Sequence, residues 1–202
     1  YSVEGNVDRA IEEYKLTLMH DPESAIVYSR LSSEYLKKGM FSLALETCRA
    51  ALSRDPKMLD ARLMLASLYS STHENAEALK EYDEVLRRDP ANEEAVVYKA
   101  QVLVEEERSK EASTLLRQFV KTSPESAVAW YYLGRVEQKN TRFTEAVLAY
   151  RKSLELRPSF GQAGLALGYL YEEKGDNEQA IQIYREIYDQ SQGTNLSVTV
   201  TG

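Results

Sequence analysis

The 202-residue sequence predicts an all-α fold in which antiparallel helix hairpins stack one on the next as an α-solenoid. Two observations carry this prediction. All five prolines are spaced 34 residues apart, at Pro22, Pro56, Pro90, Pro124 and Pro158. A row of alanines keeps the same spacing: Ala10, Ala44, Ala78, Ala112, Ala146 and Ala180. A fixed period of this length, with one small residue and one helix-stopping residue in each period, is typical of stacked helical hairpins.

The period divides the chain into repeats that each begin three residues after a proline. The full repeats span 25–58, 59–92, 93–126, 127–160 and 161–192, and residues 1–24 supply the end of an earlier repeat. We expect residues 1–192 to form one continuous array, because repeats of this kind contact only their neighbours. The register places Tyr1 inside a first helix, which indicates that the chain is a fragment of a longer protein.

Each repeat is expected to form two helices that approach each other closely. The eighth residue of every repeat is small: Ser32, Ala66, Ala100, Gly134 and Gly168. The alanine row provides a second small position, and large residues at the seventh, eleventh and twenty-fourth positions fill the space between hairpins. Nine of the 14 tyrosines fall on such packing positions, and Tyr188 is expected at another buried position. Each proline ends a repeat because it cannot continue the preceding helix.

The run Trp130-Tyr131-Tyr132-Leu133-Gly134, followed by Ala146, Tyr150 and Pro158, resembles the pattern of the tetratricopeptide repeat (TPR) family. Tyr28, Leu31, Tyr35, Ala44 and Pro56 form a similar series, and the resemblance covers residues 1 to about 190. It implies a right-handed superhelix whose first helices line a concave surface. The chain departs from the pattern at Glu137, where an aromatic residue is usual, and at Lys99, where leucine is usual. Repeat 93–126 is therefore the least typical.

Composition and residue content exclude several classes of function. A net charge of -7 argues against nucleic acid or an anionic membrane surface as the partner. No apolar run is long enough to insert into a membrane. Cys48 is the only cysteine and is expected to be a small buried hydrophobe, and His20 and His73 are expected in solvated loops. The sequence thus shows no catalytic residues, no metal ligands and no cofactor motif, and predicts that the protein is not an enzyme.

Four tyrosines are not explained by packing: Tyr98, Tyr131, Tyr132 and Tyr169, all on expected first helices. For Tyr98 and Tyr132, packing against the neighbouring hairpin remains an equal alternative. The resemblance implies that one face of the first helices binds ligands, and helical spacing places eight candidates on that face. These peptide-binding candidates are Leu63, Val97, Gln101, Tyr131, Arg135, Lys139, Leu165 and Tyr169. An aromatic strip with a few charges suits an extended peptide, because tyrosine offers a large contact area and arginine binds carboxylates or carbonyls.

One specialised ligand of the family is not expected. Family members that bind the C-terminal tail of a chaperone use a clamp of lysine and asparagine residues. The corresponding positions of the early repeats hold Ser29, Ser33, Leu63 and Ser67. The clamp is absent, so a chaperone tail is not the predicted partner.

The last ten residues, 193–202, break the helical period. Leu196, Val198 and Val200 alternate with polar residues, which favours an extended or disordered tail. Such a tail could dock into the groove of another copy and make the protein a homo-oligomer. The sequence also shows no capping helix after the last repeat, so the terminal repeat itself could associate with another copy.

These observations predict a non-catalytic scaffold that binds a peptide or a partner protein on its concave face. Two alternatives remain open: a self-assembling structural protein, and the regulatory portion of a larger protein. The Asp-Pro turns and the regular charged residues of the second helices indicate a soluble bacterial protein, from the cytoplasm or the periplasm.

Overall fold

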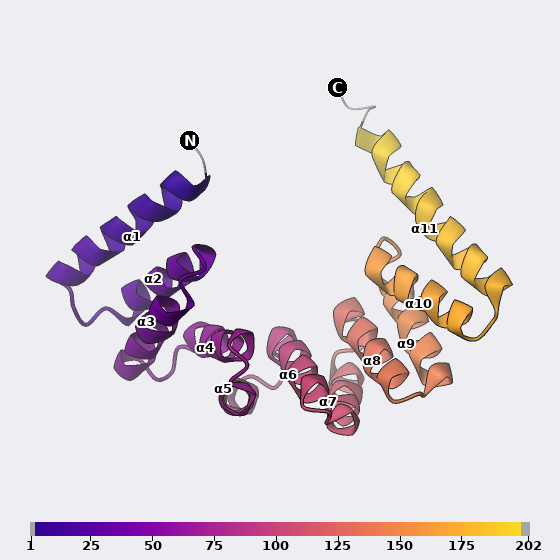
Figure 1. Ribbon diagram of the computed structural model, residues 1–202, viewed down its shortest axis with the longest axis horizontal. Helices are drawn as coiled ribbons and strands as arrows, with labels where there is room; N and C mark the ends of the chain where they lie inside the picture. The colour runs from indigo at the N-terminus through magenta and orange to yellow at the C-terminus, as the bar shows by residue number, and fades with distance from the viewer. Residues whose placement is uncertain (1–2, 199–202) are drawn as a thin grey trace. The chain divides into compact units, whose positions relative to one another are not determined.

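The computed structural model describes the backbone of residues 3–198 and the side chains of residues 6–190. In this range the chain forms eleven helices and no strand (Figure 1), which confirms the all-α prediction. The helices are α1 Val3–His20, α2 Ala25–Lys37, α3 Phe41–Arg54, α4 Leu59–Ser71, α5 Asn75–Arg88, α6 Glu93–Glu105, α7 Ser109–Thr122, α8 Ala127–Lys139, α9 Phe143–Leu156, α10 Gly161–Glu173 and α11 Asn177–Val198.

The chain divides into two compact units, Tyr1–Ala95 and Val96–Gly202. In the first unit α2 packs on α3 and α4 on α5, while α1 contacts α2 and α3 contacts α4. In the second unit α8 packs on α9 and α10 on α11, while α7 contacts α8 and α9 contacts α10. The array expected over residues 1–192 thus consists of two units, and the boundary between them falls within repeat 93–126.

Both helices of every repeat recur with the predicted period. The first helices begin at residues 25, 59, 93, 127 and 161, and the second helices at residues 41, 75, 109, 143 and 177. The turn between the two helices contains one residue with a positive φ angle, and these residues share the period: Gly39, His73, Glu107, Thr141 and Gly175. In each turn the next N–H bonds a carbonyl five residues back, as Arg142 N does to Glu137 O at 2.9 Å. A single left-handed residue therefore closes each first helix and reverses the chain.

The Asp-Pro turns close the second helices. The carboxylate of Asp55 accepts a hydrogen bond from the N–H of Lys57 at 2.9 Å, and Asp89 accepts one from Ala91 at 3.2 Å. The aspartate side chain thereby holds the turn in which the proline stops the helix.

The two helices of a hairpin meet where a small residue faces a large one. A β-carbon added to Gly134 would lie 2.6 Å from ring carbons of Tyr150, and one added to Gly168 would lie 2.3 Å from Tyr184. In the first unit, Ser32 is fully buried and its hydroxyl donates to the carbonyl oxygen of Ala44 at 2.7 Å. The small eighth residue of each repeat therefore sets how closely its two helices approach.

The sequence favours an extended or disordered tail from residue 193, whereas α11 continues to Val198. A lone strand would leave its backbone donors and acceptors without a neighbouring strand, whereas a continued helix satisfies them within the segment. Leu196 and Val198 therefore lie on helical backbone. Val200 lies outside the described residues.

Gly134→Leu should destabilise the protein by about 3 kcal/mol or more, because the new side chain has no space beside the Tyr150 ring. Gly161→Ala is the matched control: a β-carbon there meets nothing within 4 Å, and the change should be neutral or stabilise by up to about 1 kcal/mol. Thermal unfolding followed by circular dichroism measures both variants. Equal midpoints for Gly134→Leu and the parent chain would contradict the close approach.

Candidate functional site

In the second unit, α6, α8, α9 and α10 line a cavity of about 450 Å³. Helix α6 contributes Gln101, Val104 and Glu105, and α8 contributes the largest share of the wall. Helix α8 begins after Ser126, whose hydroxyl accepts a hydrogen bond from Ala129 N–H at 2.9 Å and so caps the helix. From this start, spacings of three and four residues bring Tyr131, Arg135, Gln138 and Lys139 to the cavity.

The aromatic part of the cavity is centred on Tyr131. Its ring lies edge-on to Tyr132 with centroids 5.1 Å apart, 6.0 Å from the ring of Tyr150 and 5.2 Å from that of Phe160. The guanidinium carbon of Arg135 lies 5.9 Å from the centroid of Tyr131 and 5.7 Å from that of Tyr132. These distances allow cation–π attraction, so the rings hold the arginine at the cavity.

A chain of hydrogen bonds crosses the cavity wall. The hydroxyl of Tyr150 donates to Gln138 Oε1 at 2.9 Å, and Gln138 Nε2 donates to Glu173 Oε2 at 2.9 Å. Burial raises the pKa of Tyr150 well above its ordinary value, so its hydroxyl stays protonated and remains a donor. These two hydrogen bonds fix the side-chain positions of Tyr150 and Gln138.

Three further polar side chains have no such partner. Gln101 Nε2 is buried and makes no hydrogen bond with any described residue. Arg135 and Lys139 are exposed, and neither forms an ion pair with the residues whose side chains are described. The cavity therefore offers amide, guanidinium and ammonium donors to a ligand.

The structure brings together four of the eight peptide-binding candidates: Gln101, Tyr131, Arg135 and Lys139 line one cavity. Leu165 and Tyr169 lie outside its lining on α10, 58% and 55% exposed. Leu63 is half-buried in the first unit. Val97 is only 4% exposed, within a run of buried apolar residues on α6, and so does not belong to an exposed binding face.

The cavity lining also includes Tyr150, Gln138 and Glu105, which are not among the eight peptide-binding candidates predicted from the sequence. The twenty-fourth position of its repeat predicts a packing role for Tyr150, and in the structure Tyr150 both packs against Gly134 and lines the cavity. Gln138 shares the three- and four-residue spacing of Tyr131 and Arg135 on α8, so the sequence carries a signal for it, although it is not among the eight candidates. Glu105 occupies in its repeat the position of Lys139 in the next, so the period alone assigns it to the same face.

Glu137 lies on the opposite side of α8 and is 1% exposed. Its carboxylate accepts hydrogen bonds from Ser113 Oγ at 2.5 Å and Arg117 Nε at 2.8 Å, and Arg142 Nη1 lies 3.4 Å from it. Burial alone would raise the pKa of Glu137. The hydrogen bonds from Arg117 and Ser113, with the charges of Arg117 and Arg142, outweigh burial and hold this pKa below its ordinary value.

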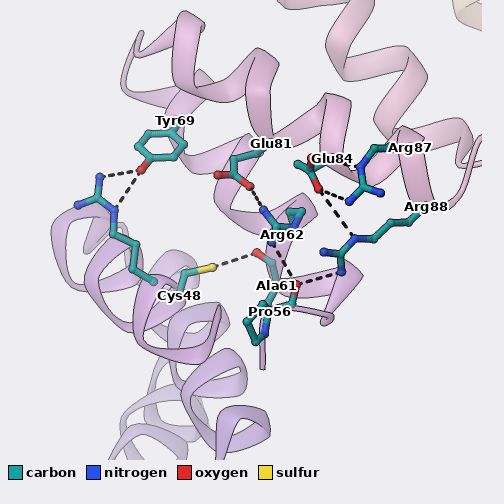
Figure 2. A network of polar contacts seen from close by, with 10 residues as sticks. Cys48, Pro56, Ala61, Arg62, Tyr69, Glu81, Glu84, Arg87 and Arg88 are labelled. Carbon is teal, nitrogen blue, oxygen red and sulfur yellow. Dashed lines mark hydrogen bonds and ion pairs between the residues drawn. The ribbon is translucent and has the colours of Figure 1, made fainter. Parts of the chain in front are cut away.

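The arginine at Glu137 belongs to a recurring contact between repeats. Arg49 donates to the Tyr69 hydroxyl through Nε and Nη2 at 3.1 and 2.7 Å, and Arg151 donates to the Tyr171 hydroxyl at 3.3 and 2.9 Å. Figure 2 shows the two bonds that reach Tyr69. Glu137 occupies the same repeat position as Tyr69 and Tyr171. A glutamate therefore replaces the aromatic residue there, and it still accepts a hydrogen bond from the arginine of the preceding second helix, Arg117.

Figure 2 also shows how a polar network in the first unit ties helices together. Arg62 Nη1 lies 2.5 Å from Glu81, and the carbonyl of Pro56 accepts from Arg62 at 3.1 Å and Arg88 at 3.0 Å. Cys48 is fully buried, its thiol donates to Ala61 O at 3.0 Å, and burial raises the pKa of the thiol to about 11. The prediction of a small buried cysteine is confirmed, and the raised pKa keeps its thiol protonated at neutral pH.

Among the described residues, no group of three His, Cys, Asp or Glu side chains is placed to hold a metal ion. His20 and His73 are exposed, as expected. No helix within residues 3–198 is both long and apolar enough to cross a membrane.

Comparison with known families agrees with this architecture. Two models described as tetratricopeptide repeat match residues 35–83 and 133–194. A third model, described as anaphase-promoting complex, cyclosome, subunit 3, matches residues 71–153. The chain belongs to the tetratricopeptide repeat family. No curated protein sequence matches it.

Solved structures share this TPR fold. MamA from Desulfovibrio magneticus RS-1 (residue 41 to its end) is 21% identical with a TM-score of 0.71, over 84% of this chain and 96% of that chain. YrrB, whose structure is titled a TPR protein with an unusual peptide-binding site, is 20% identical with a TM-score of 0.66, over 94% of this chain and 98% of that chain. Pseudomonas aeruginosa PilF is 26% identical with a TM-score of 0.71, over 83% of this chain and 77% of that chain.

Glu137→Gln should destabilise the protein at pH 7 by about 1–2 kcal/mol, because it removes the charge that Arg117 and Arg142 share. Both arginines are nearly half exposed, which keeps the loss at the low end for a buried carboxylate. Since the folded-state pKa is lowered, the contribution is complete above the unfolded pKa of about 4.3 and is lost as pH falls below it.

Urea unfolding of both proteins at pH 7 and at low pH checks this expectation. Glu137→Tyr, which restores the residue type of Tyr69 and Tyr171, is the matched variant and should lose its pH dependence while keeping the contact with Arg117. A difference between Glu137→Gln and the parent chain that stays constant with pH would contradict the account.

Proposed function

We propose that the chain is a non-catalytic interaction scaffold whose second unit binds an extended peptide segment of a partner protein in the cavity between α6 and α8. The observation that carries the proposal is the convergence of an aromatic cluster with donors that make no hydrogen bond or ion pair with any residue whose side chain is described. Tyr131 and Tyr132 supply the rings, and Gln101 and Arg135 supply the donors.

The chemistry of the cavity suits a peptide. Its volume of about 450 Å³ lies within the range of ligand pockets, and its walls combine apolar side chains with a few polar groups. The tyrosine rings offer a large contact area to an apolar or aromatic side chain. The Gln101 amide can donate to a backbone carbonyl, and Arg135 can donate to a carbonyl or a carboxylate.

The similarity to YrrB supports a peptide as the ligand class, because YrrB is described as a TPR protein with an unusual peptide-binding site. The alternative in which residues 193–202 dock as an extended segment in the groove of another copy has less support. Residues 193–198 are helical, so the conformation that this alternative needs is not the one that the chain adopts there.

Tyr131→Ala and Arg135→Ala should each weaken the binding of a selected peptide by about 10- to 100-fold, as truncation of a central aromatic or arginine contact typically does. The peptide comes from selection of a random peptide library against the intact chain, and fluorescence anisotropy measures its affinity. Tyr188→Ala is the matched control, because Tyr188 is an exposed tyrosine outside the cavity lining and is not a peptide-binding candidate, so its truncation should leave the affinity unchanged.

Selected peptides that bind both cavity variants as tightly as the parent chain would overturn the proposed site. Circular dichroism of each variant excludes loss of fold as the cause of weaker binding.

A further inference from the structure

Two donors of the cavity lie in one layer across the first helices. Gln101 of α6 and Arg135 of α8 are 34 residues apart, so they occupy the same position in consecutive repeats. Both line the cavity. Gln101 Nε2 is buried and makes no hydrogen bond with any described residue. We call Gln101 and Arg135 the donor layer.

The positive charge of Arg135 has no counter-charge in this layer. Its guanidinium forms no ion pair with the residues whose side chains are described, and the rings of Tyr131 and Tyr132 hold it at 5.9 and 5.7 Å. The next repeat has a tyrosine, Tyr169, at the same position. The donor layer therefore contains a charge and a buried N–H group that both lack an anionic partner.

Lys139, the other cation of the lining, is in a different situation. It lies four residues after Arg135, and the same repeat position holds Glu105 on α6 and Glu173 on α10. Glu105 lines the cavity beside Lys139, and Glu173 is bound to Gln138 of the cavity wall. Two carboxylates thus offset the charge of Lys139 within its own layer, whereas none offsets that of Arg135.

A bound segment that covers the donor layer takes the guanidinium of Arg135 out of water. This costs free energy unless the segment supplies a negative charge. A backbone carbonyl of the peptide would accept a hydrogen bond but would leave the charge uncompensated. A carboxylate compensates the charge, and its two oxygens can accept from both the guanidinium and the Gln101 amide.

Resting on the proposed function, we propose that the bound segment is acidic: an aspartate or glutamate side chain binds Gln101 and Arg135, and an apolar side chain two residues away packs on Tyr131 and Tyr132. The spacing follows from the geometry of the two chains. Tyr131 and Arg135 are four residues apart, which is about 6 Å along α8. In an extended peptide, side chains two residues apart point to the same side and are about 6.6 Å apart.

The net charge of the protein does not decide against an acidic ligand. The chain carries a net charge of -7, which repels an acidic peptide at long range. At physiological ionic strength, however, exposed charges more than about 8 Å away are largely screened. The contact with Arg135 lies within that distance, so it determines which peptide is preferred.

Selection from a synthetic library of peptides that are acetylated and amidated at their ends, against the intact chain, tests the proposal. Such peptides have no terminal carboxylate, so an acidic group has to come from a side chain. The selected peptides should carry aspartate or glutamate two residues from a large apolar or aromatic residue. Replacing this acid by its amide should weaken binding about 10- to 100-fold, as measured by fluorescence anisotropy.

Variants of the donor layer identify the residues that bind the acid. With Arg135→Gln, the acidic peptide and its amide version should bind about equally, because the partner of the carboxylate is gone. Arg135→Glu should reverse the preference and bind a version with lysine in place of the acid more tightly than the acidic one. Gln101→Met, which keeps the size of the side chain and removes the donor, should weaken the acidic peptide more than its amide version.

Lys121→Glu is the matched control, because Lys121 is an exposed cation outside the cavity lining and its reversal changes the net charge by the same amount as Arg135→Glu. It should leave the preference for the acidic peptide unchanged. Arg135 is itself exposed, and circular dichroism confirms that each variant is folded.

The outcomes separate this proposal from the proposed function. Peptides that Tyr131→Ala weakens, but that carry no acid or bind Arg135→Gln as tightly as the parent chain, would overturn the acidic ligand and leave the cavity as the peptide site. An acid at no fixed spacing from the apolar residue would also overturn the proposal. If no peptide is selected, or if all selected peptides bind Tyr131→Ala and Arg135→Gln as tightly as the parent chain, both are overturned.

Discussion

The close approach of the two helices in each hairpin is the constraint on which the rest of the structure depends. Gly134 faces the ring of Tyr150 and Gly168 faces that of Tyr184, with no space for even one added carbon. Ser32, Ala66 and Ala100 hold the same register position and are fully buried or nearly so. The size of this residue sets the helix spacing, and the spacing decides which side chains of the first helix reach its neighbours.

This constraint joins the fold to the candidate site through Tyr150. Its ring packs against Gly134, its hydroxyl holds Gln138, and its side chain forms part of the cavity. On the other side of α8, Glu137 binds Ser113 and Arg117 of α7. Helix α8 is thus held from both sides, and its cavity-facing residues are presented by a fixed helix and not by a loop.

The sequence predicts the fold well because the period is a property of the backbone and of small residues. Prolines, the alanine row and the residue at position eight of each repeat are enough to locate both helices of a repeat. The site is predicted only in part: Gln138 shares the helical spacing of the candidates but is neither aromatic nor charged, and Tyr150 reaches the cavity from a second helix, which a face defined on the first helices does not include. The predictions for Val97 and Tyr188 differ from the structure in opposite ways: Val97, expected on an exposed face, is buried, and Tyr188, expected to be buried, is exposed. The burial of a residue depends on what covers its helix face, and a register assigned within one repeat does not contain that information. The alternating residues after 192 favour a strand, but β-propensity is weak where no neighbouring strand exists.

The central claim is that α6 and α8 of the second unit form the peptide-binding surface. The most direct test is a titration of isotopically labelled protein with a library-selected peptide, followed by amide chemical shifts. The account predicts that the largest shifts fall on residues 100–105 of α6 and 131–139 of α8. Shifts confined to the first unit, or to α7 and the outer face of α9, would contradict it.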